Sequence, residues 1–165
     1  MAIRLEGSCR CGAVRFSLDS HSPQPYQRCY CTICRKTAGG GGYAINIMGK
    51  TAGMVITGKD AISVYQADIC DDEGKNCKIS TGQRNFCSKC ATALWMYHPE
   101  WPDFIYPFAS AIDTRLPTPP ERVHLFLHNK ADWVMPAVGR RDRRFDKYPE
   151  QSIEDWHKQR GLWID

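Results

Sequence analysis

Residues 9–12, CRCG, form the stretch of sequence that most constrains the fold, because their two cysteines have counterparts far along the chain. Residues 87–90 read CSKC and residues 29–34 read CYCTIC, so seven of the nine cysteines fall into three tight clusters. Adjacent C-x-C and C-x2-C pairs are typical of thiolate metal ligands. All-thiolate sites suit zinc or iron–sulfur clusters, and of the two we predict zinc.

The number of clustered cysteines divides unevenly between two tetrahedral zinc sites. Four thiolates close a structural site, whereas three leave a second zinc with an open position, as in catalytic zinc sites. A site shared by residues 9–11 and 87–90 would join two distant turns, whereas residues 29–34 supply ligands too locally to do so. Spacing alone also permits another partition, in which the pairs at 9–11 and 29–31 share one zinc and Cys34 joins the pair at 87–90.

Length and composition are those of one ordinary globular domain, which we expect to span residues 1–165. Hydrophobic residues make up 42% of the chain and charged residues 24%, which indicates a folded rather than a disordered protein. No stretch approaches the ~18 apolar residues of a membrane helix. The chain begins MAIRLE, without the apolar run of a signal peptide, so we expect a cytoplasmic protein with reduced thiols rather than a disulfide framework.

The net charge argues against nucleic acid as a partner. The formal charge is +4 when the cysteines are counted as neutral. Seven thiolates and two Zn²⁺ ions together add −3, which leaves a charge of +1 and removes most of the apparent basicity. The basic cluster at residues 140–144, RRDRR, includes an acid, and we interpret it as a solvated loop.

Short strands separated by Gly, Pro and Asp predict a mainly β fold. Residues 13–18, AVRFSL, alternate apolar and polar side chains as a half-buried strand does. Further strands are predicted at residues 43–47, 54–57, 62–66, 77–81, 94–97, 105–109 and 123–127. One short helix is predicted near the C-terminus, where Ser152 can cap its start and Gly161 can end it.

Three motifs in this order resemble a known family. Residues 7–14 read GSCRCGAV, residues 29–35 read CYCTICR and residues 84–92 read RNFCSKCAT. Together they are similar to the glutathione-dependent formaldehyde-activating enzyme family, which also includes centromere protein V. Residues 123–133 resemble the closing strand of that family in part. Residues 136–165 match nothing in the pattern, and we treat them as a C-terminal extension of the domain.

The resemblance implies a zinc-stapled β-tent of small antiparallel sheets, and it implies one partition of the cysteines. The structural zinc would be held by Cys9, Cys11, Cys87 and Cys90. The catalytic zinc would be held by Cys29, Cys31 and Cys34, with its fourth position open, so that each chain carries two zinc ions. The family's named activity joins glutathione and formaldehyde into S-hydroxymethylglutathione, which makes the implied enzyme a carbon–sulfur lyase.

A glutathione-type thiol substrate carries carboxylates, so cations beside the open zinc are candidate binding residues. Arg35 and Lys36 directly follow Cys34 and are predicted to bind substrate, and Arg28 precedes Cys29. Residues 37–42, TAGGGG, could present backbone N–H groups to a carboxylate, but we interpret them as a flexible turn before a strand, because no phosphate-loop lysine and serine or threonine follow them.

A second hypothesis is a zinc-stabilised, non-catalytic binding module. It requires a fourth protein ligand for the second zinc, and the candidates are Cys70, Cys77 and a histidine such as His21 or His98. Cys70 and Cys77 could instead form a regulatory disulfide, but we expect them to be ordinary thiols, since six intervening residues match no standard ligand spacing. Both histidines adjoin loop sequence, and we do not predict either as a ligand.

Overall fold

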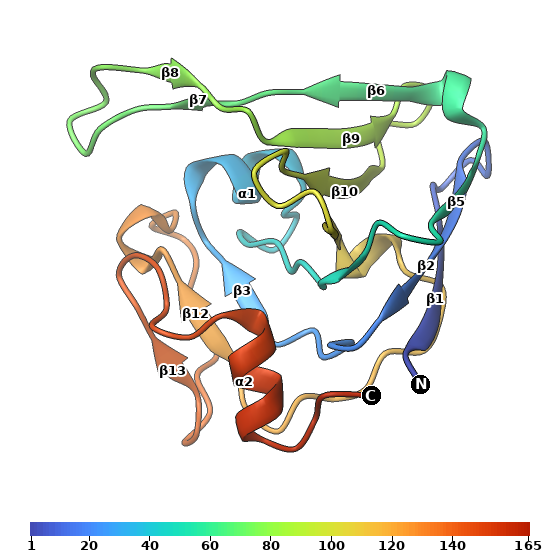
Figure 1. Cartoon of the computed structure of the whole chain (residues 1–165). Helices are drawn as coiled ribbons and strands as arrows, with labels where there is room; N and C mark the ends of the chain where they lie inside the picture. Colours follow the sequence, from blue (N-terminus) through green and yellow to red (C-terminus); the bar gives the residue numbers. More distant parts are fainter.

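Four small sheets and two short α-helices make up the computed structural model, which describes residues 1–165 (Figure 1). The prediction of a mainly β fold is therefore confirmed. The strands are two to six residues long, because turn-forming Gly, Pro and Asp recur along the chain. None of the helices is long and apolar enough to cross a membrane.

The first sheet carries one cysteine pair on its opening turn. Its strands are β1, β2 and β5, paired antiparallel, with bounds Ile3–Ser8, Arg15–Ser20 and Val55–Thr57. Phe16 and Leu18 point into the core while their neighbours are more exposed, as the alternation predicts. Gly12 closes the turn between β1 and β2 with φ +76°, a left-handed conformation that glycine adopts without strain.

The largest sheet carries the second cysteine pair. Its strand order is β4-β11-β10-β9-β6, with bounds Gly49–Lys50, Phe104–Pro107, Ala93–Tyr97, Gln83–Cys87 and Ile62–Tyr65. Its core face packs against the first sheet, where the rings of Phe16 and Trp95 meet edge to face at 5.1 Å. Cys87 ends β9, so the turn into β10 lies beside this shared core.

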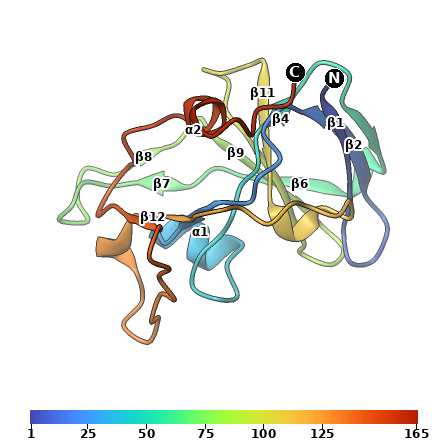
Figure 2. The ribbon, with the colours of Figure 1, turned by 90° about the horizontal axis from the view of Figure 1, so that it is seen from below.

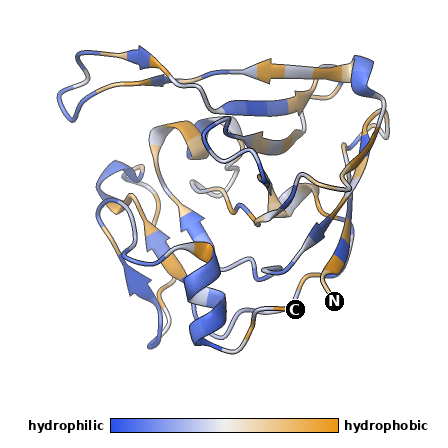
Figure 3. Cartoon of the chain, viewed as in Figure 1, coloured by the Kyte–Doolittle hydropathy of each residue, from blue (hydrophilic) through white to orange (hydrophobic).

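The third sheet differs from the predicted antiparallel pairing. Strands β3, β12 and β13 run parallel, with β12 in the centre and bounds Gln27–Cys29, Val123–Leu125 and Arg143–Arg144. Long connections rather than hairpins join these strands, and such connections permit parallel pairing. Figure 3 shows β13 as hydrophilic, and its arginines are exposed as predicted, but they form a paired strand rather than the predicted loop.

Helix α2, Ile153–Gln159, covers the third sheet and confirms the C-terminal helix prediction. Ser152 caps it by accepting a hydrogen bond from the Asp155 N–H, and Gly161 follows its end with φ +63°. The buried Trp156 ring stacks on Tyr26 with ring centroids 3.7 Å apart. The two chain termini lie close together in both views (Figures 1 and 2).

Two features of the chain correct the predictions. A second helix, α1 (Thr32–Thr37), lies within the three-cysteine motif, so the prediction of one helix was wrong. A hairpin of β7 (Asp68–Ile69) and β8 (Lys78–Ile79) brings Cys70 and Cys77 together in a disulfide. The expectation that these two cysteines are ordinary thiols was therefore wrong, because antiparallel pairing places the residues that flank a hairpin loop opposite each other.

Candidate metal centres

The turns after β1 and β9 bring four cysteines together, which we call the four-cysteine cluster. Its members are Cys9, Cys11, Cys87 and Cys90, and their sulfurs all lie within 4.8 Å of one another. The Cys9 and Cys11 sulfurs are 3.5 Å apart, and those of Cys11 and Cys87 are 3.8 Å apart. A tetrahedral zinc with Zn–S distances of ~2.3 Å places its sulfurs about 3.8 Å apart. The donor set and its spacing therefore fit zinc.

Hydrogen bonds at the four-cysteine cluster favour thiolates at Cys9 and Cys90, whereas at Cys11 the lowering effect of the Ala13 backbone is outweighed by contacts with Cys9 and Cys90, which raise its pKa to about 11. The Val14 N–H donates to the Cys9 sulfur at 3.2 Å, and this bond helps to lower the pKa of Cys9 although burial alone would raise it. The Thr92 hydroxyl lies 3.2 Å from the Cys90 sulfur and, with the Thr92 backbone N–H, lowers the pKa of Cys90 to about 5. Metal ligands must be deprotonated, so the contacts at Cys9 and Cys90 favour the form of these two residues that binds a cation.

Cys29, Cys31 and Cys34 form the second group, which we call the three-cysteine cluster. Their sulfurs also lie within 4.8 Å of one another. Cys29 ends β3, Cys31 is the N-cap of α1, and Cys34 lies inside the helix. The Cys31 sulfur accepts a hydrogen bond from the Cys34 N–H at 3.3 Å, so the C-x2-C spacing itself starts the helix. The sequence held this signal, but a cysteine is not among the usual capping residues.

The three sulfurs share their protons unequally. Hydrogen bonds from the Cys29 and Cys34 thiols lower the pKa of Cys31 to about 2. The same contacts raise the pKa of Cys29. Arg84 adds positive charge, because its Nη2 lies 3.6 Å from the Cys34 sulfur. The cluster thus holds negative charge on sulfur, which suits a bound cation, and the Arg84 guanidinium beside it favours further negative charge.

Arg84 is a residue of this cluster that the sequence analysis missed. It comes from β9, 50 residues beyond Cys34, and also lies near the Thr37 hydroxyl at 3.5 Å. The third motif of the resemblance begins with Arg84. Its spacing nevertheless points to the cysteines at 87 and 90, and nothing in the sequence connects it with α1.

The predicted substrate-binding residues lie on α1 beside the three-cysteine cluster. Lys36 is exposed and forms no hydrogen bond or ion pair within the chain, so its charge is free to meet a ligand. Arg35 is half-buried, and its Nε donates to the Asn129 carbonyl at 3.2 Å. The Arg28 guanidinium lies over the Tyr43 ring, 4.9 Å from its centroid. Of these three cations, Lys36 is the one whose charged group makes no interaction within the chain.

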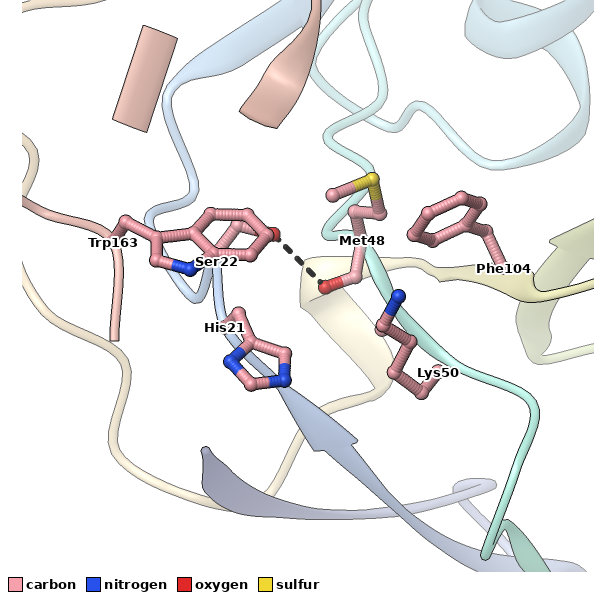
Figure 4. Close-up of a pocket in the computed structure, with 7 residues that line it drawn as sticks. His21, Ser22, Met48, Lys50, Phe104 and Trp163 are labelled. Carbon is pink, nitrogen blue, oxygen red and sulfur yellow. Dashed lines mark hydrogen bonds between the residues drawn. The ribbon is translucent and has the colours of Figure 1, made fainter. Parts of the chain in front are cut away.

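The histidines and the remaining cysteines lie outside both clusters. His21 stacks on Trp163 at 5.1 Å in a small hollow with Lys50 and Phe104 (Figure 4). His98 lies beside the Thr81 hydroxyl at 3.3 Å. The Cys70 and Cys77 sulfurs are bonded to each other. No fourth protein ligand accompanies the three-cysteine cluster.

The architecture defines a class of protein, a mainly β domain with one cluster of four cysteines and one of three. Comparison with known proteins points to a family. Residues 4–129 match the family model of the glutathione-dependent formaldehyde-activating enzyme. A protein of Halomonas elongata, provisionally named as such an enzyme, is 56% identical over 158 residues, which cover 96% of this chain and 97% of the relative. The chain therefore belongs to the glutathione-dependent formaldehyde-activating enzyme family.

A solved structure shares the fold at lower identity. A crystal structure of a Rhodobacter sphaeroides protein superposes with a TM-score of 0.50 and 20% sequence identity, over 68% of this chain and 91% of that chain. At this identity the likeness concerns the fold alone.

Proposed function

We propose that the protein is a zinc-dependent carbon–sulfur lyase of the S-hydroxymethylglutathione synthase type. It would add a glutathione-type thiol to formaldehyde or a related small electrophile. The observation that carries the proposal is the contrast between the two clusters, since one offers four sulfurs and the other offers three sulfurs beside Arg84. The provisional name of the Halomonas elongata relative supports the substrate pair.

We propose that the four-cysteine cluster holds a structural zinc and that Cys29, Cys31 and Cys34 hold a catalytic one. Zinc bound to the three-cysteine cluster would supply a coordination position at which a thiol loses its proton more readily than in water. Three thiolates outweigh the charge of Zn²⁺ by one unit. The site is therefore better suited to positioning a thiol than to strong Lewis-acid activation of a carbonyl.

The chain's own cations would bind and orient the substrate. Lys36 is free to pair with a substrate carboxylate, and the guanidinium of Arg35 retains N–H groups for the same purpose. Arg84 would stabilise the negative charge that a bound thiolate adds to the cluster. In the reaction the thiol sulfur forms a bond to the formaldehyde carbon and the carbonyl oxygen receives a proton, so RSH and CH₂O give RSCH₂OH without an oxidant or reductant.

NMR exchange spectroscopy tests this proposal directly. The rates of exchange among glutathione, formaldehyde and S-hydroxymethylglutathione would be measured with wild-type protein and with Cys31→Ser at catalytic concentrations. We expect acceleration above the spontaneous rate, lost in the variant, while the fold remains. A Cys31→Ser protein that turns over normally would refute the catalytic role of the cluster.

The alternative, a non-catalytic zinc module, is the other outcome of that experiment. It needs a fourth protein ligand at the three-cysteine cluster, and Cys70 and Cys77 are bonded to each other instead. Absence of acceleration with two zinc ions bound would favour it, and would redirect the search to other thiols or to protein partners. We further propose that residues 1–165 form one cytoplasmic domain, with residues 136–165 as its extension.

A further inference from the structure

His124 is a fully buried histidine that the proposed reaction does not use. It lies in the central strand β12, and its Nδ1 is 2.9 Å from the hydroxyl of Tyr30, which is also fully buried. Its Nε2 is 3.3 Å from the carboxylate of Asp142, whose side chain is 3% exposed. Three polar side chains thus form one hydrogen-bonded chain through the protein interior.

The chemistry of Asp142 fixes where the protons lie. Its carboxylate accepts hydrogen bonds from the backbone N–H groups of Gly139 and Arg122, each at 2.8 Å. Burial would raise the pKa of Asp142, but these bonds lower it, so the group is a carboxylate. Burial lowers the pKa of His124, which is therefore neutral. The proton of His124 must then lie on Nε2 toward the carboxylate, and Nδ1 accepts from the Tyr30 hydroxyl.

Tyr30 connects this chain of hydrogen bonds to the three-cysteine cluster, because it stands between Cys29 and Cys31. The backbone on both sides of it is also tied down. The Tyr30 N–H donates to the Leu125 carbonyl at 3.0 Å, and Cys29 exchanges hydrogen bonds with Ala44 at 2.9 and 3.0 Å. Anchoring the Tyr30 ring in the interior fixes the turn on which the sulfurs of Cys29 and Cys31 are mounted.

We propose that Asp142, His124 and Tyr30 are positioning residues that hold Cys29 and Cys31 at the separation a metal requires. The inference rests on the proposed zinc site. Asp142 lies beyond residue 129, where the family match ends, so residues 136–165 supply the anion that orients the site. Groups hydrogen-bonded to metal ligands change metal affinity by about 10- to 100-fold in metalloproteins, and we take the same range for an effect that passes here through the Tyr30 backbone.

Zinc affinity, measured without reference to activity, tests the proposal. Purified full-length protein would be dialysed against graded concentrations of a zinc chelator, and the zinc retained would be counted. A Cys34→Ser variant identifies which zinc belongs to the three-cysteine cluster. Cobalt substitution adds a spectroscopic signature, because the absorption bands of thiolate-bound Co²⁺ report changes in ligand geometry.

The variants Tyr30→Phe and Asp142→Asn are compared with Ser20→Ala. Ser20 is an equally buried hydroxyl, and it donates to the Met48 carbonyl at 2.7 Å. We expect Tyr30→Phe and Asp142→Asn to weaken zinc binding at the three-cysteine cluster 10- to 100-fold and to shift its cobalt bands, with the other zinc unchanged. Ser20→Ala should leave both zinc ions in place even where it lowers stability equally.

The outcomes separate this inference from the proposed function. Two zinc ions with unchanged affinity in both variants, or with parallel weakening at both clusters, would overturn the positioning role alone. A wild-type protein that binds no zinc at the three-cysteine cluster would overturn the positioning role and the proposed function together. Tyr30→Phe removes a single oxygen, so it carries the test if Asp142→Asn fails to fold.

Discussion

Replacing Cys87 and Cys90 together with serine should destabilise the protein far more than replacing Cys31 and Cys34 together. The comparison is matched, because each pair contains one buried and one half-buried cysteine. The cost of burying a serine hydroxyl is therefore similar on the two sides. What differs is the length of chain that each cluster closes.

The chain entropy that each cluster removes gives the size of the difference. The four-cysteine cluster joins Cys11 to Cys87 across 76 residues. Treated as a cross-link, such a loop stabilises the folded state by roughly 4.5 kcal/mol. The three-cysteine cluster spans only the six residues 29–34, for which the same relation gives about 2 kcal/mol. Hydrogen bonds within α1 already hold much of that short loop, so the actual loss should be smaller.

Thermal and urea unfolding of the zinc-loaded proteins, followed by circular dichroism, measures the two losses. For a chain of this size 1 kcal/mol corresponds to about 2–4 °C in Tm, so the Cys87/Cys90 variant should lose roughly 9–18 °C. The Cys31/Cys34 variant should lose less than half as much. Equal losses, or a larger loss for Cys31 and Cys34, would refute the division into a structural and a catalytic cluster.

Three further predictions address single residues. Arg84→Met should lower kcat/KM for the glutathione reaction about tenfold, or ~1.4 kcal/mol, because it removes the cation beside the three-cysteine cluster; an unchanged value would exclude Arg84 from the site. His157 is buried, and burial is the main reason why its pKa is lowered from 6.5. The unfolded chain therefore binds a proton at this histidine more readily than the folded chain does, and the free energy of unfolding decreases as pH falls below 6.5. His157→Gln should reduce that slope by up to about 1.4 kcal/mol per pH unit in unfolding experiments between pH 7 and 5, and an identical slope would contradict the assignment. Gly42→Ala should cost about 1–3 kcal/mol in urea unfolding, since φ is +85° and the new Cβ would lie 2.4 Å from a methyl carbon of Val134, whereas Gly40→Ala meets no atom within 4 Å and should be nearly neutral.

The cysteine spacing was sufficient to predict three local groups of candidate metal ligands. A C-x-C turn and a C-x2-C turn are short enough that their members must be neighbours whatever the rest of the chain does. The β-strands were found for a similar reason, since alternation over 13–18 is a local property. Spacing alone left two partitions open, and in the folded chain Cys9 and Cys11 meet Cys87 and Cys90.

Features that depend on pairing across the chain were not found. Arg84 reaches Cys34 only because β9 passes beside α1, and the sequence pattern around it points to other cysteines. The bond between Cys70 and Cys77 depends on a hairpin whose two strands are only two residues long each. A strand was predicted at residues 77–81, which contains β8, but strands of two residues give no alternation that would reveal their pairing.

The Asp142–His124–Tyr30 chain shows why the C-terminal extension had no visible role in the sequence. Its members are separated by 18 and 94 residues, and they meet because β12 pairs in parallel with both β3 and β13. Parallel pairing leaves no hairpin signal, since the connection has no fixed turn. The pattern of residues 140–144 is dominated by four arginines, which are exposed in the structure. It gives no sign that the one acid among them has a separate role. The side chain of that acid is 3% exposed, accepts hydrogen bonds from two backbone N–H groups and faces His124, so Asp142 has defined partners in the fold although the sequence indicated only a solvated loop.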